Sequence, residues 1–195
     1  MIVERGGDIM KRKRIFSISC AMAFFLALIF VSVPEKVKAV FFDQISVHDT
    51  KTRISNFMGI DIRSCQILQE SDSHGGFLGD GQTFVELQAT KAEFHRIVGE
   101  MTKEWKNFPL TENLSKAIYG KKTKTEQRLP LLVDEKTENS LIPVIGDGYY
   151  YFEDRNELSS DSADDSHLFE RNSWNFTLVI LDRETYRIYY VEYDT

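Results

Sequence analysis

The chain has 195 residues, of which 42% are hydrophobic and 28% charged, and its formal net charge is −6. This length and composition fit one ordinary domain with an additional segment, and they exclude two full-sized domains, a wholly disordered chain and a small disulfide-rich scaffold. The negative charge also argues against a broad basic surface, so no nucleic-acid partner is expected.

The amino-terminal part of the chain differs in charge from the rest. Residues 1–39 carry seven Lys and Arg against three Asp and Glu, whereas residues 40–195 carry 17 against 27, a net charge of −10. Four cations are consecutive at Lys11–Arg14, and a run of 19 uncharged residues, 15–33, follows them directly. As a helix that run spans about 28 Å, close to the ~30 Å hydrocarbon core of a bilayer. The pattern predicts a signal peptide or a transmembrane helix over residues 15–33.

The preference for cations on the cytoplasmic side makes residues 1–14 a basic cytoplasmic head and sends the rest of the chain out of the cytoplasm. The apolar run is either a signal peptide, cleaved at the small-x-small site Val37–Ala39, or an uncleaved anchor that keeps the protein in the membrane. Met10 could be the true start in either case. A buried helix of a soluble core is disfavoured because the run has no polar face. Residues 34–49 are expected to be a linker, and residues 50–195 an extracytoplasmic domain.

The two cysteines do not predict a disulfide framework. Cys20 lies inside the apolar run, which leaves Cys65 as the only cysteine of the body, so no intramolecular disulfide can form there. Cys65 is flanked by isoleucines and is interpreted as a small buried apolar residue rather than a reactive thiol.

The first half of the body predicts a short helix, two strands and one longer helix. Residues 50–58 are amphipathic and end at a glycine, residues 60–68 read as a strand, and residues 83–88 form a strand after a glycine-rich connection. Thr90 and Glu93 have the spacing of a capping box. One apolar stripe then runs at helical spacing through five residues: Phe94, Ile97, Val98, Met101 and Trp105.

The second half predicts a shorter helix and then mainly strands. Thr111 and Gly120 bracket a helix over residues 111–119. Residues 121–128 are expected to be a loop, residues 129–133 a short strand, residues 149–152 a strand, and residues 156–167 a solvated loop. The chain closes with a predicted β-hairpin whose strands are residues 174–180 and 186–193.

These elements predict an α+β fold. We expect an antiparallel sheet with the C-terminal β-hairpin packed against one long and one short helix, both on one face, and preceded by the N-terminal hydrophobic helix. No parallel crossover pattern appears.

Three strings in the body resemble those of small extracytoplasmic proteins of Gram-positive bacteria that have no assigned activity. They are residues 72–81 (DSHGGFLGDG), 148–155 (GYYYFEDR) and 175–178 (NFTL). The resemblance covers most of residues 50–195. It implies a secreted or membrane-anchored domain and supplies no catalytic residues.

The glycine-rich loop around His74 is the most suggestive chemical feature. Its His-Gly-Gly string is similar to the oxyanion loop of some lipases, but no Gly-x-Ser-x-Gly nucleophile elbow and no phosphate-binding loop occur in the chain. The simpler interpretation is a tight connection in which the glycines take positive φ angles and His74 is solvated or caps the turn.

Metal and cofactor sites have little support in the sequence. Five acidic residues in or near one loop could offer oxygen ligands to Ca²⁺, but their spacing matches no EF-hand, and a solvated loop is the default interpretation: Asp154, Glu157, Asp161, Asp164 and Asp165. The four histidines are scattered and form no zinc motif: His48, His74, His95 and His167. No catalytic, cofactor-binding or metal-binding residue is therefore assigned, and no cofactor is predicted.

The carboxyl-terminal third is dense in aromatic residues, including Tyr149–Phe152 and four later tyrosines. Ordinary packing between neighbouring strands explains this pattern, and an exposed tyrosine-rich binding face is the alternative.

The absence of enzyme motifs together with the targeting segment favours a non-enzymatic extracytoplasmic module. It would bind a protein, peptide or envelope component, and would contact the membrane through residues 15–33 if they are not cleaved. The alternative is a small hydrolase with an unfamiliar site near His74 and Asp80, with Asp154 and Arg155 as further candidates.

Overall fold

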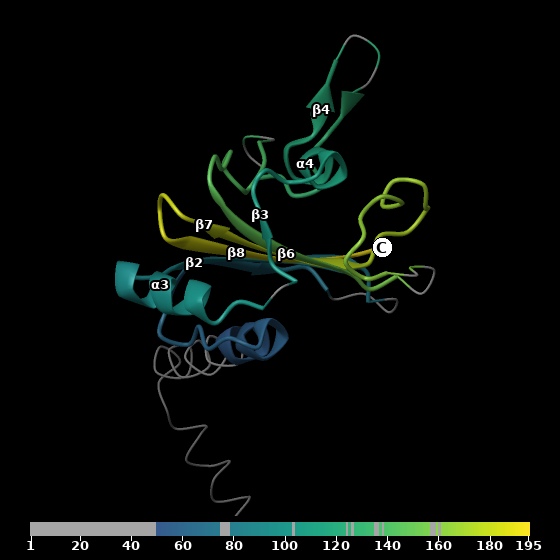
Figure 1. Ribbon diagram of the computed structural model, residues 1–195. Helices are drawn as coiled ribbons and strands as arrows, with labels where there is room; N and C mark the ends of the chain where they lie inside the picture. The colour runs from purple at the N-terminus through teal and green to yellow at the C-terminus, as the bar shows by residue number, and fades with distance from the viewer. Residues whose placement is uncertain are drawn as a thin grey trace, which may run out of the picture. The chain divides into compact units, whose positions relative to one another are not determined.

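The fold comes from a computed structural model (Figure 1) that describes residues 50–195, apart from 75–78, 103, 124, 126, 135–136, 138, 157–158 and 160. The predicted segments 1–14, 15–33 and 34–49, and the hydrophobic helix among them, lie outside the described residues. Within the described residues, no helix has both the length and the apolar content to cross a membrane.

A six-stranded antiparallel sheet forms the centre of the domain, with strand order β1-β2-β8-β7-β6-β3. Its strands are β1 (Gln66–Asp72), β2 (Gly81–Gln88), β3 (Lys106–Asn107), β6 (Gly148–Asp154), β7 (Phe176–Asp182) and β8 (Arg187–Asp194). Strands β7 and β8 are the predicted C-terminal hairpin, and β6 contains the predicted aromatic strand. The α+β class and the antiparallel sheet are therefore confirmed.

Burial changes steadily from the middle of the sheet to its edge. All seven residues of β7 are buried, which is why its sequence FTLVILD has no alternation of apolar and polar residues. Strand β6 alternates between buried and half-buried residues, whereas six of the seven residues of β1 are exposed. Within the part of the chain that the structure describes, the sheet thus has a fully covered centre and a bare edge at β1.

Helices pack on both faces of this sheet, and not on one face as the sequence predicts (Figure 1). The helix of residues 50–58 and α3 (Lys91–Gly99) cover one face, and α4 (Glu112–Tyr119) lies on the other. Strand β8 has apolar residues facing both layers, with Ile188 and Tyr190 in the core beneath α3, and Tyr189 and Val191 in the core beneath α4. We call these layers the α3 face and the α4 face.

Helix α3 begins as predicted but ends early. The side chain of Thr90 accepts a hydrogen bond from the Glu93 amide, and the Glu93 carboxylate accepts one from the Thr90 amide, so the capping box is formed. The helix stops at Gly99, and the prediction of helix as far as Trp105 is wrong. Met101 and Trp105 nevertheless pack against the same core. The apolar stripe therefore identified the residues that contact the core correctly, although not their backbone conformation. Non-helical backbone can also place apolar side chains against a core.

Helix α4 matches its prediction at both ends and on its inner face. The hydroxyl of Thr111 accepts a hydrogen bond from the Leu114 amide, and Gly120 follows the last turn with a φ of 72°. Leu114, Ala117 and Ile118 are buried.

Three short segments differ from their predictions. Residues 121–128 contain a small two-stranded sheet, β4 (Lys121–Lys122) with β5 (Gln127–Arg128), instead of only a loop. Residues 129–133 form no strand, and only Val133 makes an isolated bridge, to Ser140. The strand predicted over residues 60–68 starts later, at Gln66, because the apolar residues before it are buried in irregular backbone beneath α3.

Candidate functional site

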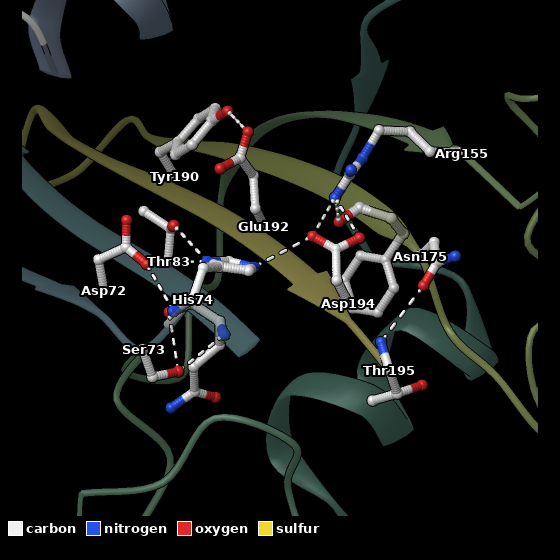
Figure 2. A network of polar contacts seen from close by, with 12 residues as sticks. Asp72, Ser73, His74, Thr83, Arg155, Asn175, Tyr190, Glu192, Asp194 and Thr195 are labelled. Carbon is white, nitrogen blue, oxygen red and sulfur yellow. Dashed lines mark hydrogen bonds and ion pairs between the residues drawn. The ribbon is translucent and has the colours of Figure 1, made fainter. Parts of the chain in front are cut away.

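His74 follows β1 and lies between two carboxylates (Figure 2). Its Nδ1 is 2.8 Å from Asp72 Oδ1, and its Nε2 is 3.1 Å from Asp194 Oδ2 at the end of β8. The hydroxyl of Thr83 on β2 is 3.2 Å from the same Nδ1. The side chain of His74 is only 19% exposed, so the first of the two alternatives from the sequence, a solvated residue rather than one that caps the turn, is wrong.

The two carboxylates determine what the imidazole can do. An ionised carboxylate only accepts hydrogen bonds, so both ring nitrogens must carry hydrogens for both contacts to be hydrogen bonds. The charged imidazolium satisfies both, whereas a neutral ring loses one of them. His74 thus connects the turn after β1 to the end of β8 through its two ring nitrogens.

Asx geometry and one close backbone approach fix the position of His74. Its backbone amide donates to Asp72 Oδ1 at 2.9 Å, which turns the chain after β1. Gly81 starts β2 directly against this turn, and a Cβ there would come within 2.7 Å of the His74 amide nitrogen. Position 81 therefore needs a glycine because the backbone of His74 lies too close for a side chain. Gly79, two residues earlier, has a φ of 75°, a conformation that favours glycine for a different reason.

Two arginines take part in polar contacts near this site, and Figure 2 shows one of them, Arg155. Arg155, which follows β6, contacts both carboxylate oxygens of Asp194 at 3.0 Å. Arg53, on the helix of residues 50–58, lies 3.1 Å from Glu192. Glu192 also accepts a hydrogen bond from the Tyr190 hydroxyl. Burial, and then this bond to a carboxylate, raise the pKa of Tyr190 above its ordinary value.

The hydrolase candidates are only partly brought together. His74 and Arg155 meet through Asp194, and Asp80 lines a neighbouring hollow of about 370 Å³. Asp154 instead forms an ion pair with Arg171 at 2.8 Å, with both side chains largely buried. Among the described residues, the one hydroxyl close to the imidazole belongs to Thr83, which is 0% exposed and so closed to a substrate.

Sequence reasoning missed the two residues that hold His74. Asp72 could have been found, since an aspartate two positions before a turn residue is a common local signal. Asp194 carries no local signal, because only the pairing of β2 with β8 brings it near.

The acidic loop is held by hydrogen bonds within it and to the start of α4. Asp165 accepts from the Thr111 hydroxyl, Asp164 from Ser166, and Asp161 from the Ala163 amide. Glu157 and His48 lie outside the described residues. Across the described part of the chain, no group of three or more His, Cys, Asp or Glu side chains is arranged to hold a metal ion.

The aromatic side chains lie in the two cores, so the exposed tyrosine-rich face does not exist in the described domain. Tyr150, Tyr189 and Tyr190 are buried, and Tyr149 and Tyr151 are packed against the α3 face core. Edge-to-face pairs such as Phe57 with Tyr190, at 5.8 Å between ring centroids, join the layers. Packing between elements, the simpler of the two sequence interpretations, is confirmed.

The bare edge of the sheet is the other candidate site. Among the described residues, strand β1 pairs with β2 alone and is the first strand of the sheet. A register shift between Ile67 and Gln69 leaves Leu68 unpaired and 42% exposed. A hollow of about 390 Å³ lies on the strand, and its lining residues are Gln69, Ser71, Asp72, Ser73, Gln82, Val133, Asp134 and Leu141.

The backbone groups that face outward from β1 can be identified from the register. The Ser73 amide donates to the Gln82 carbonyl at 2.9 Å, and Ser71 and Gln69 follow at two-residue steps opposite Phe84 and Glu86. Hydrogen bonding alternates along an antiparallel pair, so the amides and carbonyls of Glu70 and Asp72 point away from β2. An added strand would find its hydrogen-bonding partners at these two residues.

Comparison with known proteins adds no relative: no protein-family model, no curated protein and no solved structure matches this chain.

Proposed function

We propose that residues 50–195 form a non-enzymatic binding module that acts outside the cytoplasm on a protein or peptide. Residues 15–33 either anchor it in the membrane or direct its secretion. The proposal for its location is supported by the sequence alone, through the four cations at Lys11–Arg14 and the 19 uncharged residues that follow.

The observation that carries the binding function is the open edge of β1. An exposed strand with free amides and carbonyls is a template for a further strand, and proteins usually shorten or cover such edges. Here the edge is seven residues long, six of them are exposed, and a hollow lies along it. Addition of a strand at a sheet edge is a common mode of peptide recognition, in which backbone hydrogen bonds give affinity and side-chain pockets give specificity.

The hydrolase alternative has less support from the same geometry. A catalytic histidine needs one nitrogen directed at a nucleophile or substrate and the other at an orienting group. In this domain both nitrogens of His74 face carboxylates, and the neighbouring hydroxyl of Thr83 is buried. The network therefore fits a structural link better than a reaction centre.

The test is whether peptides bind and whether they need the β1 edge. The full chain, purified in a non-ionic detergent, is screened by fluorescence anisotropy against extended peptides of seven to ten residues with varied side chains. Glu70→Pro removes an outward amide without removing a hydrogen bond to β2, and Glu70→Ala removes only the side chain. Binding that survives Glu70→Ala and is lost in Glu70→Pro supports the proposal, provided that both variants keep the far-UV circular dichroism of the original chain. No binding by any peptide, or binding indifferent to Glu70→Pro, contradicts it.

The location is tested by mass spectrometry of the chain after membrane fractionation. A new terminus near Val40 indicates cleavage and secretion, and an intact chain in the membrane fraction indicates an anchor. An intact chain in the soluble cytoplasmic fraction contradicts the proposed location.

A further inference from the structure

We propose that the peptide recognised at β1 is an extended segment with basic side chains at alternate positions and small ones between them. This inference rests on the proposed function and names the chemistry of its partner. It follows from which side chains share each face of the open edge.

The two residues with outward backbone groups also carry the two carboxylates of the strand. Glu70 and Asp72 are separated by two positions, so their side chains lie on the same face of the sheet. That face is the α3 face, because the Thr50 hydroxyl, on the helix of residues 50–58, donates to Glu70 Oε1 at 2.6 Å. A partner residue bonded to Glu70 and another bonded to Asp72 would both project toward this carboxylate pair.

The two nearby arginines form ion pairs with carboxylates other than Glu70 and Asp72. Arg53 lies against Glu192, and Arg155 against Asp194. Glu70 has no ion pair among the described residues, and Asp72 is held by His74 with 47% of its side chain still exposed. Arg53 acts on Asp72 through its charge, but among the described residues neither carboxylate forms an ion pair with an arginine or a lysine. Lysine or arginine on an added strand would complete two cross-strand pairs of opposite charge.

On the other face of the same edge, an added strand would meet a different surface. Gln69, Ser71 and Ser73 are on the α4 face, where the 390 Å³ hollow is closed by Val133 and Leu141. The intervening residues of an added strand would point into this hollow, whose lining is mainly polar and includes Asp134 and Gln82 beside the two apolar side chains. Small side chains fit there, and this alternation gives the partner its pattern.

A second copy of this chain is a poorer occupant than a basic peptide. Residues 40–195 carry a net charge of −10, so two copies repel one another, whereas a basic segment is attracted. Self-association is accordingly one outcome of the test.

The experiment compares three blocked nonapeptides, alternating Lys–Val, Ser–Val and Glu–Val, for binding to the full chain in non-ionic detergent. We expect the Lys–Val peptide to bind about tenfold more tightly than the Glu–Val peptide at low salt, since two opposite-charge pairs replace two like-charge pairs. The preference should shrink as salt is raised. Glu70→Lys should remove or reverse it, while the control Glu170→Lys, which changes the net charge equally in a different exposed loop, should leave most of it.

Each result has a distinct meaning. Equal binding of the three peptides, lost in Glu70→Pro, keeps the open edge as a binding site and overturns the basic partner. If Glu70→Lys and Glu170→Lys reduce the preference for the Lys–Val peptide equally, the preference comes from general attraction to an acidic protein. That result overturns the inference. A dimer in analytical ultracentrifugation that Glu70→Pro dissociates shows that the occupant is a second copy. No binding by any peptide overturns the proposed function itself.

Discussion

His74 Nε2 lies 3.1 Å from Asp194 Oδ2, although the two residues are 120 positions apart in the sequence. The contact joins the turn after the edge strand β1 to the end of β8. Strand β2 lies between β1 and β8 in the sheet. Since Arg155 contacts the same carboxylate, Asp194 connects three separate segments of the domain. The contact therefore stabilises the end of the sheet that borders the proposed binding edge.

We predict that removing either partner destabilises the domain, and that the two losses are not additive. His74→Ala and Asp194→Asn should each lower the free energy of unfolding by about 1–2 kcal/mol, because each removes one hydrogen bond between two largely buried side chains. The double variant should lose less than the sum by about 0.5–1.5 kcal/mol. Urea unfolding followed by tryptophan fluorescence measures all four states of the cycle.

The matched control for this cycle is His167→Ala. His167 also contacts a carboxylate, Glu170, but its side chain is 72% exposed. Its removal should change stability by no more than about 0.5 kcal/mol. Strictly additive losses for His74 and Asp194 would show that they do not interact.

The pH dependence of stability should contain a contribution from Asp72. Burial acts to raise the pKa of this carboxyl, but the hydrogen bonds from the His74 amide and ring outweigh it, and the pKa is lowered. A carboxyl whose pKa is lower in the folded than in the unfolded state stabilises the fold above its unfolded pKa of about 3.9. This stabilisation is lost as the pH falls through the folded value.

The measurement is the free energy of unfolding of the original chain and of Asp72→Asn between pH 3 and 6. Asparagine keeps an oxygen that can accept the His74 amide, so the turn is preserved while the charge is removed. The difference between the two proteins should be largest near pH 6 and shrink toward pH 3. A difference that is constant across this range would exclude the predicted role of the charge.

Features set by neighbouring residues were predictable from the sequence. The capping box of Thr90 and Glu93, the ends of α4 at Thr111 and Gly120, and the C-terminal hairpin all depend on residues within a few positions of one another. The apolar stripe of α3 also identified buried residues correctly. Its length was misjudged because pairing of β3 with β6 requires an extended chain from Lys106, which periodicity does not reveal.

Features set by distant pairing were not predictable. Helices on both faces follow from the position of β7 in the middle of the sheet, and a buried strand of seven residues gives no sign of which helix covers which face. The site shows the same limit. Asp72 is two positions from His74, but Asp194 reaches it only through the pairing of β2 with β8, and the open edge of β1 follows from strand order.

Close contact between β6 and β7 predicts a large effect at Gly148. A Cβ at this position would lie 2.2 Å from the Leu181 carbonyl oxygen, which belongs to the backbone of the central strand. Gly148→Ala should therefore cost about 1–3 kcal/mol of stability, since neither backbone can move without disturbing the sheet. Gly99→Ala is the control, because a Cβ there has no atom within 4 Å and alanine favours a helix by up to about 1 kcal/mol. Equal melting temperatures for the two variants in circular dichroism would contradict the strand contact.

The last prediction concerns Cys65, whose thiol is buried beneath α3 and is 1% exposed. Burial raises its pKa to about 11, and the charge of Glu93 acts in the same direction. The thiolate is the reactive form, so the folded domain should resist a thiol reagent such as a disulfide dye at pH 8. A chain with Cys20→Ser leaves Cys65 as the only thiol, so that the dye reports on this residue alone.

In this background, labelling of Cys65 should be slow in buffer and complete within minutes in denaturing urea. The raised pKa also sets the direction of the pH effect. Burial of the neutral thiol stabilises the fold fully below the unfolded value of about 8.5, and this is lost as the pH rises toward 11. Cys65→Ala should lack this alkaline loss, because alanine does not ionise. Fast labelling of the folded chain at pH 8 would mean that Cys65 is accessible, which would contradict its burial in the core beneath α3.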